Sequence, residues 1–288
     1  MRAPWGGPHG GVPPFDAVEV EKFAPALEAA MAAKTAEIEA IAANPEPPTF
    51  ENVVVAGERA GRELDRVQML FSVHSGTLST PAVQAIERDF APRLSALADS
   101  IFHNARLFAR LEAVYNARES AGLTPEQQRL AWFHHDRFVR AGARLDDVAK
   151  KRLSAINAQL ATLFATFRQN VLADETDYVL DLTPADLAGL PESVLTGAAA
   201  VAAERGREVG HAVANTRSSV EPFLTWSTRR DLRERVWRTY YSRGDNGDTH
   251  DNNRIIADIL ALRHERARLL GFETHAHWRL GNTMAGVP

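Results

Sequence analysis

The chain has 288 residues and a formal net charge of -4, with 45% hydrophobic and 24% charged residues. These proportions are typical of a soluble globular protein, and no apolar run reaches the length of about eighteen residues that a membrane span needs. The absence of cysteine excludes disulfides, a thiolate nucleophile and cysteine-based zinc sites. Basic residues are mixed with acidic ones, which argues against nucleic acid or an anionic membrane as a partner.

The amino-terminal segment is rich in glycine and proline and lacks the apolar core of a secretory signal. Trp5 and Phe15 have apolar area to bury, so we expect this segment to lie as an extended arm on the body. The first helix is expected to begin near Pro25, because a fixed φ and a missing N–H suit the first turn of a helix. It should end at Asn44-Pro45.

Start signals for further helices follow at regular intervals. Thr49 is an expected N-cap for a helix that reaches about His74. Thr80-Pro81 opens a second pattern, which extends to about Tyr115 with a break near His103-Asn104. The sequence therefore predicts a succession of helices rather than strands in this part of the chain.

Thr124-Pro125-Glu126-Gln127 is a capping box with proline in the first helical position. The helix that it opens should reach Gly142. A long helix is then expected over residues 145–173, where apolar residues recur at helical spacing. These residues are Leu153, Ile156, Leu160, Leu163, Phe167 and Val171.

The pattern changes at Asp174. Residues 178–182 alternate as a strand does, residues 192–204 form an alanine-rich helix, and residues 209–214 could form a partner strand. The predicted fold class is therefore all-α, with many helices and a small two-stranded β element. We expect three parts: a helical lobe with its arm (1–175), a small α+β segment (176–225) and a helical segment (226–288).

Two amphipathic helices are predicted between Thr228 and Phe272, joined by a polar loop. Leu232, Val236 and Tyr240 form the apolar stripe of the first helix. In the second, the stripe consists of Ile255, Ile259, Leu262 and Leu269. Gly271-Phe272 is typical of a helix end with a left-handed glycine followed by an apolar residue.

The triplet that begins at His264 resembles the start of an H-E-x-x-H zinc motif. In that motif two histidines one turn apart bind zinc, and the glutamate deprotonates the zinc-bound water. Here His264-Glu265 is followed by Arg268 in the place of the second histidine. Because a cation does not ligate a cation, we predict no zinc site at this position.

Other histidine pairs have unsuitable spacing for a metal. In a helix, His275 and His277 point to nearly opposite faces, and the adjacent His134 and His135 also diverge. For each of these side chains, capping, stacking or exposure to solvent is the favoured interpretation over metal binding.

The loop from Asp245 to Asp251 has the oxygen density of a calcium loop. Counting twelve residues from Asp245 or Asp248 gives Ile256 or Ile259, where a bidentate glutamate is required. We therefore interpret Asn246-Gly247 as a turn and Asp251-Asn252 as the cap of the next helix.

Phosphate-binding and serine-nucleophile motifs are also incomplete. Gly244 and Gly247 are not followed by the Lys-Ser/Thr of a phosphate-binding loop. Ser218-Ser219 has no G-x-S-x-G setting, and Ser227-Thr228 is interpreted as a helix N-cap. The residues by themselves predict no catalytic site.

Taken together, short motifs along the chain resemble the M3 family of zinc metallopeptidases, most closely its bacterial peptidyl-dipeptidase and oligopeptidase branches. Their order and spacing over nearly the whole chain carry the resemblance. They are Pro4-Trp5-Gly6-Gly7-Pro8, Gly10-Gly11-Val12-Pro13-Pro14-Phe15-Asp16, Pro48-Thr49-Phe50-Glu51-Asn52, Asn170-Val171-Leu172, Asp186-Leu187-Ala188-Gly189-Leu190-Pro191, Tyr241-Ser242-Arg243-Gly244, Asp251-Asn252, Leu262-Arg263 and Ala267-Arg268-Leu269-Leu270-Gly271-Phe272.

The resemblance implies an almost entirely helical, neurolysin-like cytoplasmic peptidase with a deep channel for short peptides. It also implies one zinc, held by H-E-x-x-H and a further glutamate, and release of carboxyl-terminal dipeptides. No position in residues 1–288 matches these catalytic, zinc-binding or substrate-gripping residues, so no catalytic or metal-binding residue is predicted here and the substrate-binding residues stay unknown.

The expected function is the amino-terminal, channel-forming portion of such a peptidase. Its partners would be short peptides and a carboxyl-terminal catalytic half. The resemblance implies that this half carries the zinc helix and the substrate-gripping residues of the family. Zinc is expected in the longer protein and not on this chain alone, which we predict to be inactive by itself. The alternative is a non-enzymatic peptide-binding or scaffold protein derived from the helical lobe.

Overall fold

A computed structural model describes residues 1–9, 11–208 and 210–288. The chain is mostly helical with one two-stranded antiparallel sheet, which confirms the predicted fold class. It divides into two compact units: the helical unit, residues 1–165 with 259–288, and the mixed unit, residues 166–258. The three-part division predicted from the sequence stays a prediction. In the described part of the chain, no helix is both long and apolar enough to cross a membrane.

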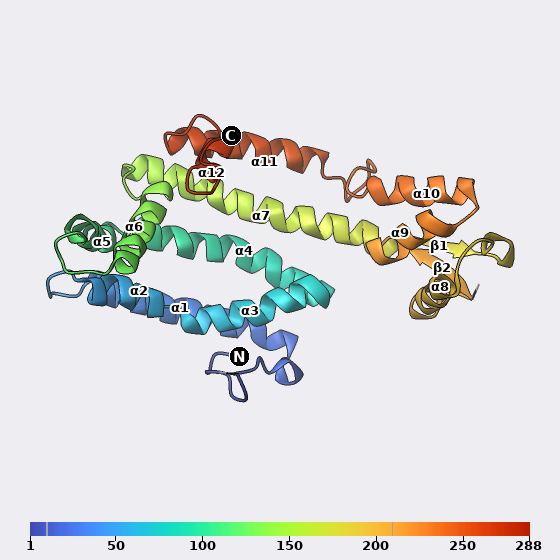
Figure 1. Cartoon of the computed structure of the whole chain (residues 1–288), viewed down its shortest axis with the longest axis horizontal. Helices are drawn as coiled ribbons and strands as arrows, with labels where there is room; N and C mark the ends of the chain where they lie inside the picture. The colour runs from blue at the N-terminus through green and yellow to red at the C-terminus, as the bar shows by residue number, and fades with distance from the viewer. Residues whose placement is uncertain (10, 209) are drawn as a thin grey trace. The chain divides into compact units, whose positions relative to one another are not determined.

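The helical unit is built from helices throughout (Figure 1). Its elements are the 3-10 turns η1 (Phe15–Ala17) and η2 (Val20–Lys22), the π-helical turn η3 (Phe50–Val55), and α1 (Phe23–Ala42), α2 (Ala56–Arg59), α3 (Arg62–Thr77), α4 (Pro81–Phe102), α5 (Ala105–Ala117), α6 (Pro125–Arg140), the first part of α7 (Asp147–Asp177), the second part of α11 (Asn253–Leu269) and α12 (His275–Leu280).

Several helices begin where the sequence predicts, because a side chain caps their first turn. The Thr80 hydroxyl accepts a hydrogen bond from the Val83 N–H at 3.3 Å, and Asn104 caps α5 after the predicted break. At Thr124 the predicted capping box is present, with the Thr124 N–H donating to the Gln127 side chain at 2.9 Å. These bonds satisfy N–H groups that have no partner within the helix.

The single helix predicted from Thr49 to His74 is wrong, because the chain breaks at Gly61. Thr49 does cap the first segment, but Gly61 has a φ of 85°, in the left-handed region. The Gly61 N–H donates to the Glu37 carboxylate at 2.6 Å, and atoms of the Lys34 side chain lie 2.6–2.7 Å from where a Cβ would stand. The left-handed φ favours glycine here, whereas the flexible end of the Lys34 side chain could move aside, and the break at Gly61 separates α2 from α3.

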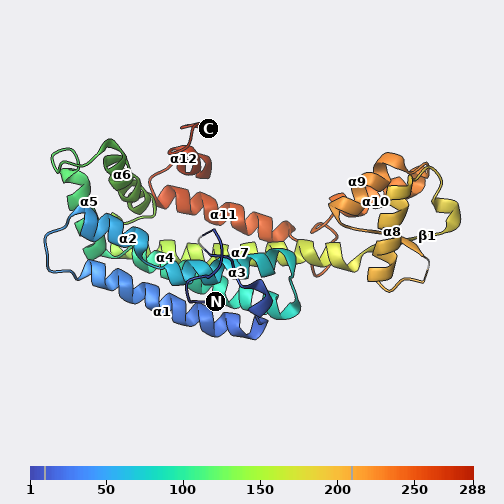
Figure 2. The same cartoon turned by 60° about the horizontal axis from the view of Figure 1, so that its bottom comes forward.

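Two apolar cores hold the helical unit together. One joins α1, α3 and α4, which Figures 1 and 2 show close to one another. The other joins the end of α1 with η3, α5 and α6. Trp5 of the amino-terminal arm packs against the first core as expected, whereas Phe15 remains 44% exposed.

The mixed unit contains the sheet. Its elements are the second part of α7, β1 (Val179–Leu182), the 3-10 turn η4 (Pro184–Asp186), α8 (Glu192–Glu204), β2 (His211–Ala214), α9 (Arg217–Trp226), α10 (Arg230–Tyr241) and the first part of α11. The two strands pair antiparallel, with Val179 opposite Ala214 and Leu182 opposite His211. This confirms the predicted sheet; Val209, the expected start of its second strand, lies outside the described residues.

The core of the mixed unit lies between the sheet and helices α9 and α10, which Figure 2 shows together with α8. Val236 is fully buried in it, and Leu232 and Tyr240 pack against it, which confirms the predicted stripe. Helix α9, which contains Pro222, is not predicted by the sequence pattern. Gly271 has a φ of 83° and the Phe272 N–H donates to the Ala267 carbonyl at 2.8 Å, so α11 ends as predicted.

Candidate functional site

The triplet at His264 lies on α11 and its glutamate is engaged elsewhere. The Glu265 carboxylate accepts hydrogen bonds from Nε and Nη2 of Arg152, both at 2.6 Å. The Arg152 guanidinium lowers the pKa of Glu265, which favours its ionised form. His264 and Arg268 are both exposed. Glu265 thus forms an ion pair with Arg152 of α7. The second histidine of a zinc motif is replaced by Arg268.

His275 and His277 lie on α12 and have different neighbours. The Thr274 hydroxyl lies 2.8 Å from Nδ1 of His277 and caps the helix, while the His275 ring packs 5.4 Å from the ring of Trp278. Burial is the main cause that lowers the pKa of His275, followed by the nearby arginines. His275 thus contacts an aromatic ring and His277 contacts the residue that caps the helix, whereas Thr274 and not a histidine provides the cap.

His134 and His135 on α6 also diverge. Nε2 of His134 lies 2.7 Å from a Glu58 carboxylate oxygen, beside a cavity of about 460 Å³. The His135 ring stacks on Tyr115, with ring centroids 4.0 Å apart and planes 7° apart. Burial is the first cause that lowers the pKa of both histidines, and it outweighs the opposing effect of their carboxylate neighbours.

Lowering the pH is expected to destabilise the helical unit through these two histidines. Because their folded pKa lies below the unfolded value of about 6.5, the unfolded chain binds more protons, and stability falls as the pH drops below that value. Urea unfolding of the wild type and of His135→Phe between pH 7.5 and 5 measures this effect. The variant should show the shallower loss; equal slopes would contradict the assignment to His135.

The acidic loop between α10 and α11 forms a turn and a cap, as predicted. The Asp251 carboxylate accepts from the N–H groups of Asn253 and Gly247, both at 2.8 Å, which lowers the pKa of Asp251. These bonds fix the start of α11 and close the loop at its glycine. Both oxygens of Asp251 therefore accept from backbone donors, while an oxygen of Asp245 accepts from the Asn253 side chain at 2.6 Å.

The structure adds Asp174 of α7 to this loop. Its carboxylate accepts from the Gly244 N–H at 2.6 Å and from the Asn246 amide at 2.8 Å. Ligand atoms of Asp174, Asp248 and His250 lie within 4.8 Å of one another. Both hydrogen bonds end on Oδ2 of Asp174 and fix the loop, while its Oδ1 lies 3.8 Å from Nδ1 of His250. The sequence does not indicate this contact, because Asp174 lies about seventy residues before the loop.

A buried polar cluster in the helical unit was also not predicted. Asp99 is only 8% exposed and accepts from the Asn157 amide at 2.8 Å, and Asn157 in turn accepts from Arg266 at 3.3 Å. The three residues line a cavity of about 340 Å³. Burial is the main cause that lowers the pKa of Arg266. The cluster joins residues from α4, α7 and α11, which are far apart in the sequence.

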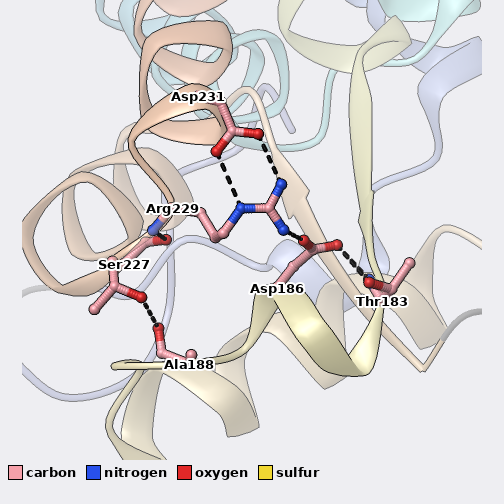
Figure 3. Close-up of polar contacts among 7 residues, drawn as sticks. Thr183, Asp186, Ala188, Ser227, Arg229 and Asp231 are labelled. Atoms are coloured by element: carbon pink, nitrogen blue, oxygen red, sulfur yellow. Dashed lines mark hydrogen bonds and ion pairs between the residues drawn. The ribbon is translucent and has the colours of Figure 1, made fainter.

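A second network fixes the beginning of α10 in the mixed unit (Figure 3). The Asp186 carboxylate accepts from the Thr183 N–H at 2.9 Å and from the Thr183 hydroxyl at 2.7 Å, and it forms an ion pair with Arg229. Arg229 also donates from Nε and Nη2 to Asp231, at 3.0 and 2.7 Å. The hydrogen bonds of Thr183 are the first cause that lowers the pKa of Asp186.

Gly189 lies next to this network, where the chain contacts the turn between α9 and α10. Gly189 has a φ of 85°, and the Thr228 hydroxyl donates to the neighbouring Ala188 carbonyl at 3.0 Å. Ser227 does not cap α10 as predicted; Arg229 occupies the cap position, and the Ser227 hydroxyl instead accepts from the Arg229 N–H at 3.2 Å. The segment from Asp186 to Pro191 thus contacts the α9–α10 turn through Asp186 and Ala188.

Comparison with known proteins supports a peptidase family. Residues 223–288 match the family model described as peptidase family M3. The chain is 35% identical to dipeptidyl carboxypeptidase of Escherichia coli over 277 residues, which is 96% of this chain and 41% of that protein. It is 29% identical to oligopeptidase A of Salmonella typhimurium, with 96% and 41% covered, and 28% identical to organellar oligopeptidase A of Arabidopsis thaliana, with 96% and 35% covered.

The chain is a homologue of the M3 peptidase family. It spans about two-fifths of the length of the dipeptidyl carboxypeptidase and oligopeptidase A relatives and corresponds to their amino-terminal portion. This confirms the resemblance seen in the sequence motifs.

Proposed function

We propose that residues 1–288 form the amino-terminal, channel-forming portion of a zinc-dependent peptidase that releases carboxyl-terminal dipeptides from short peptides in the cytoplasm. The observation that carries this proposal is the identity of 35% with a dipeptidyl carboxypeptidase over 96% of the chain. The relative's name states both the product and the end of the peptide from which it is taken.

The chemistry would be supplied elsewhere in the complete peptidase. In such an enzyme zinc lowers the pKa of a bound water to about 7 and polarises the scissile carbonyl. Residues 1–288 contain no H-E-x-x-H, and Glu265 of the nearest match is paired with Arg152. We therefore propose that zinc, the general base and the peptide-gripping residues come from the portion that corresponds to the rest of the relatives. Short peptides and that portion are the proposed partners.

The purified 288-residue chain is expected to release no dipeptide from a blocked tripeptide, with or without added zinc. Mass spectrometry of the reaction mixture checks this. The matched positive control is the Escherichia coli relative under the same conditions, whose activity a chelator should remove. Release of dipeptide by the 288-residue chain that a chelator abolishes would contradict the assignment of no catalytic residue to it.

A chimera tests the positive half of the proposal. Residues 1–288 replace the aligned region of the Escherichia coli dipeptidyl carboxypeptidase, and zinc content, melting behaviour and dipeptide release are measured. A folded, zinc-loaded chimera should release carboxyl-terminal dipeptides. If it binds zinc and melts cooperatively but releases none, the peptide-binding alternative is favoured instead.

A further inference from the structure

Helix α10 has an unusual excess of positive charge for this chain. Residues 229–243 contain six arginines and two acidic residues, in a protein whose net charge is -4. Three of the arginines, Arg229, Arg238 and Arg243, form ion pairs with carboxylates of the mixed unit. Within residues 1–9, 11–208 and 210–288, the other three, Arg230, Arg233 and Arg235, contact no carboxylate.

Two of these three arginines, which have no carboxylate partner among the described residues, lie in a groove. Arg230, Arg233 and Trp237 line an open groove of about 440 Å³ with Leu224 of α9 and Glu234. Arg233 reaches the Leu224 carbonyl at 3.5 Å, and its buried Nε has no hydrogen-bond partner among the described residues. Guanidinium groups beside an exposed ring and a leucine provide both a positive charge and an apolar wall.

Beyond the groove, the same face of the helix continues to Tyr241, which does not line the groove. Positions 230, 233, 237 and 241 recur at helical spacing, whereas Val236 and the stripe around it face the core. Trp237 and Tyr241 are 49% and 68% exposed, and their ring centroids lie 5.3 Å apart. The face therefore changes from guanidinium groups at its start to aromatic rings at its end.

The length of this face indicates the size of its ligand. From Arg230 to Tyr241 the helix rises about 16 Å at about 1.5 Å per residue. An extended peptide covers that distance with about five residues at about 3.3 Å each. We propose that the α10 groove binds an extended peptide segment with acidic side chains at one end and apolar or aromatic side chains at the other.

The groove favours a peptide over single-stranded nucleic acid, which also uses arginines and aromatic rings. Glu234 also lines the groove, and its carboxylate, which is paired with Arg238, adds negative charge that disfavours a run of phosphates. An acidic peptide places separate carboxylates and amide groups there, so its carboxylates can lie beside Arg230 and Arg233 while an N–H faces Glu234.

The test uses fluorescence anisotropy of capped, fluorescein-labelled Asp-Glu-Ala-Phe-Leu with the 288-residue chain, which is measured without any hydrolysis. Binding should weaken about tenfold in Arg230→Gln/Arg233→Gln, since each partly exposed ion pair contributes at most about a factor of five. Trp237→Ala should also weaken it. Arg235→Gln is the matched control, because it removes the same charge from α10 outside the groove.

Three results would overturn the proposal. The first is equal affinity of the double variant and Arg235→Gln, the second is equal binding of the charge-reversed peptide Lys-Lys-Ala-Phe-Leu, and the third is displacement of the acidic peptide by an oligothymidine. If Arg233→Gln alters the melting curve, the peptide affinities of Arg230→Gln and Trp237→Ala are used in its place to test the proposal. Loss of peptide release in the chimera would count against the proposed peptidase and leave this binding result unaffected.

Discussion

Replacing Gly189 with alanine is expected to lower the free energy of unfolding by about 3 kcal/mol. The φ of 85° costs an L-residue about 1–2 kcal/mol, and forcing an extra methyl group into a packed site costs about 1–3 kcal/mol. The new Cβ would stand 2.7 Å from Cγ2 of Thr228 and 2.9 Å from the Trp226 carbonyl oxygen. Because the carbonyl belongs to the backbone, the α9–α10 turn would have to move.

Alanine variants of two other glycines separate the cost of the positive φ from the cost of the steric contacts. Gly206 also has a positive φ, of 62°, but an added Cβ would meet nothing within 4 Å, so Gly206→Ala should cost only about 1 kcal/mol. Gly197 lies within α8 with open space around it, and Gly197→Ala should be neutral or stabilising by up to about 1 kcal/mol. Urea unfolding of the three variants provides the values. Equal losses for Gly189 and Gly206 would show that the contacts with the turn do not matter.

Features that depend on neighbours in the sequence could be predicted for this chain. The capping box at Thr124, the cap at Thr80 and the helix end at Gly271 each use groups within about five residues, and each is present. The break at Gly61 shows the limit. The left-handed Gly61 donates its N–H to the carboxylate of Glu37, which lies more than twenty residues earlier, so a local pattern of helical spacing continued across the break.

The polar sites show the same limit more clearly. Sequence spacing predicts no zinc site at His264 and no calcium loop at Asp245, because both motifs have fixed offsets. No offset connects Asp174 with Gly244, or Asp186 with Arg229, which lie about seventy and forty residues apart. The α10 groove was missed for a different reason. The mixed charges of the whole chain concealed a local excess, and only the contacts show which arginines have partners.

Removing the Asp186 carboxylate is expected to destabilise the mixed unit by about 3 kcal/mol. Asp186 is 8% exposed, and in Asp186→Ala the N–H and hydroxyl of Thr183 lose their acceptor, while Arg229 keeps only Asp231. Hydrogen bonds to a charged acceptor contribute about 1.5–3 kcal/mol each, and because Thr183 is exposed to water the two bonds should lie near the lower end of that range. Hydrogen exchange of the β1 and β2 amides, measured beside urea unfolding, locates the loss in this unit.

The pH dependence of the Asp186→Ala effect identifies the ionised carboxylate as its cause. Hydrogen bonds from Thr183, helped by the charge of Arg229, hold the folded pKa of Asp186 below the unfolded value of about 3.9. The stabilisation is therefore complete above about pH 4 and is lost as the pH falls through the folded pKa, so wild type and variant should converge in acid. Asp181→Ala is the matched control, because it removes a carboxylate that is paired with Arg207 on the surface, and it should change stability much less. A difference between wild type and Asp186→Ala that persists unchanged at low pH would show that the side chain acts through packing rather than charge.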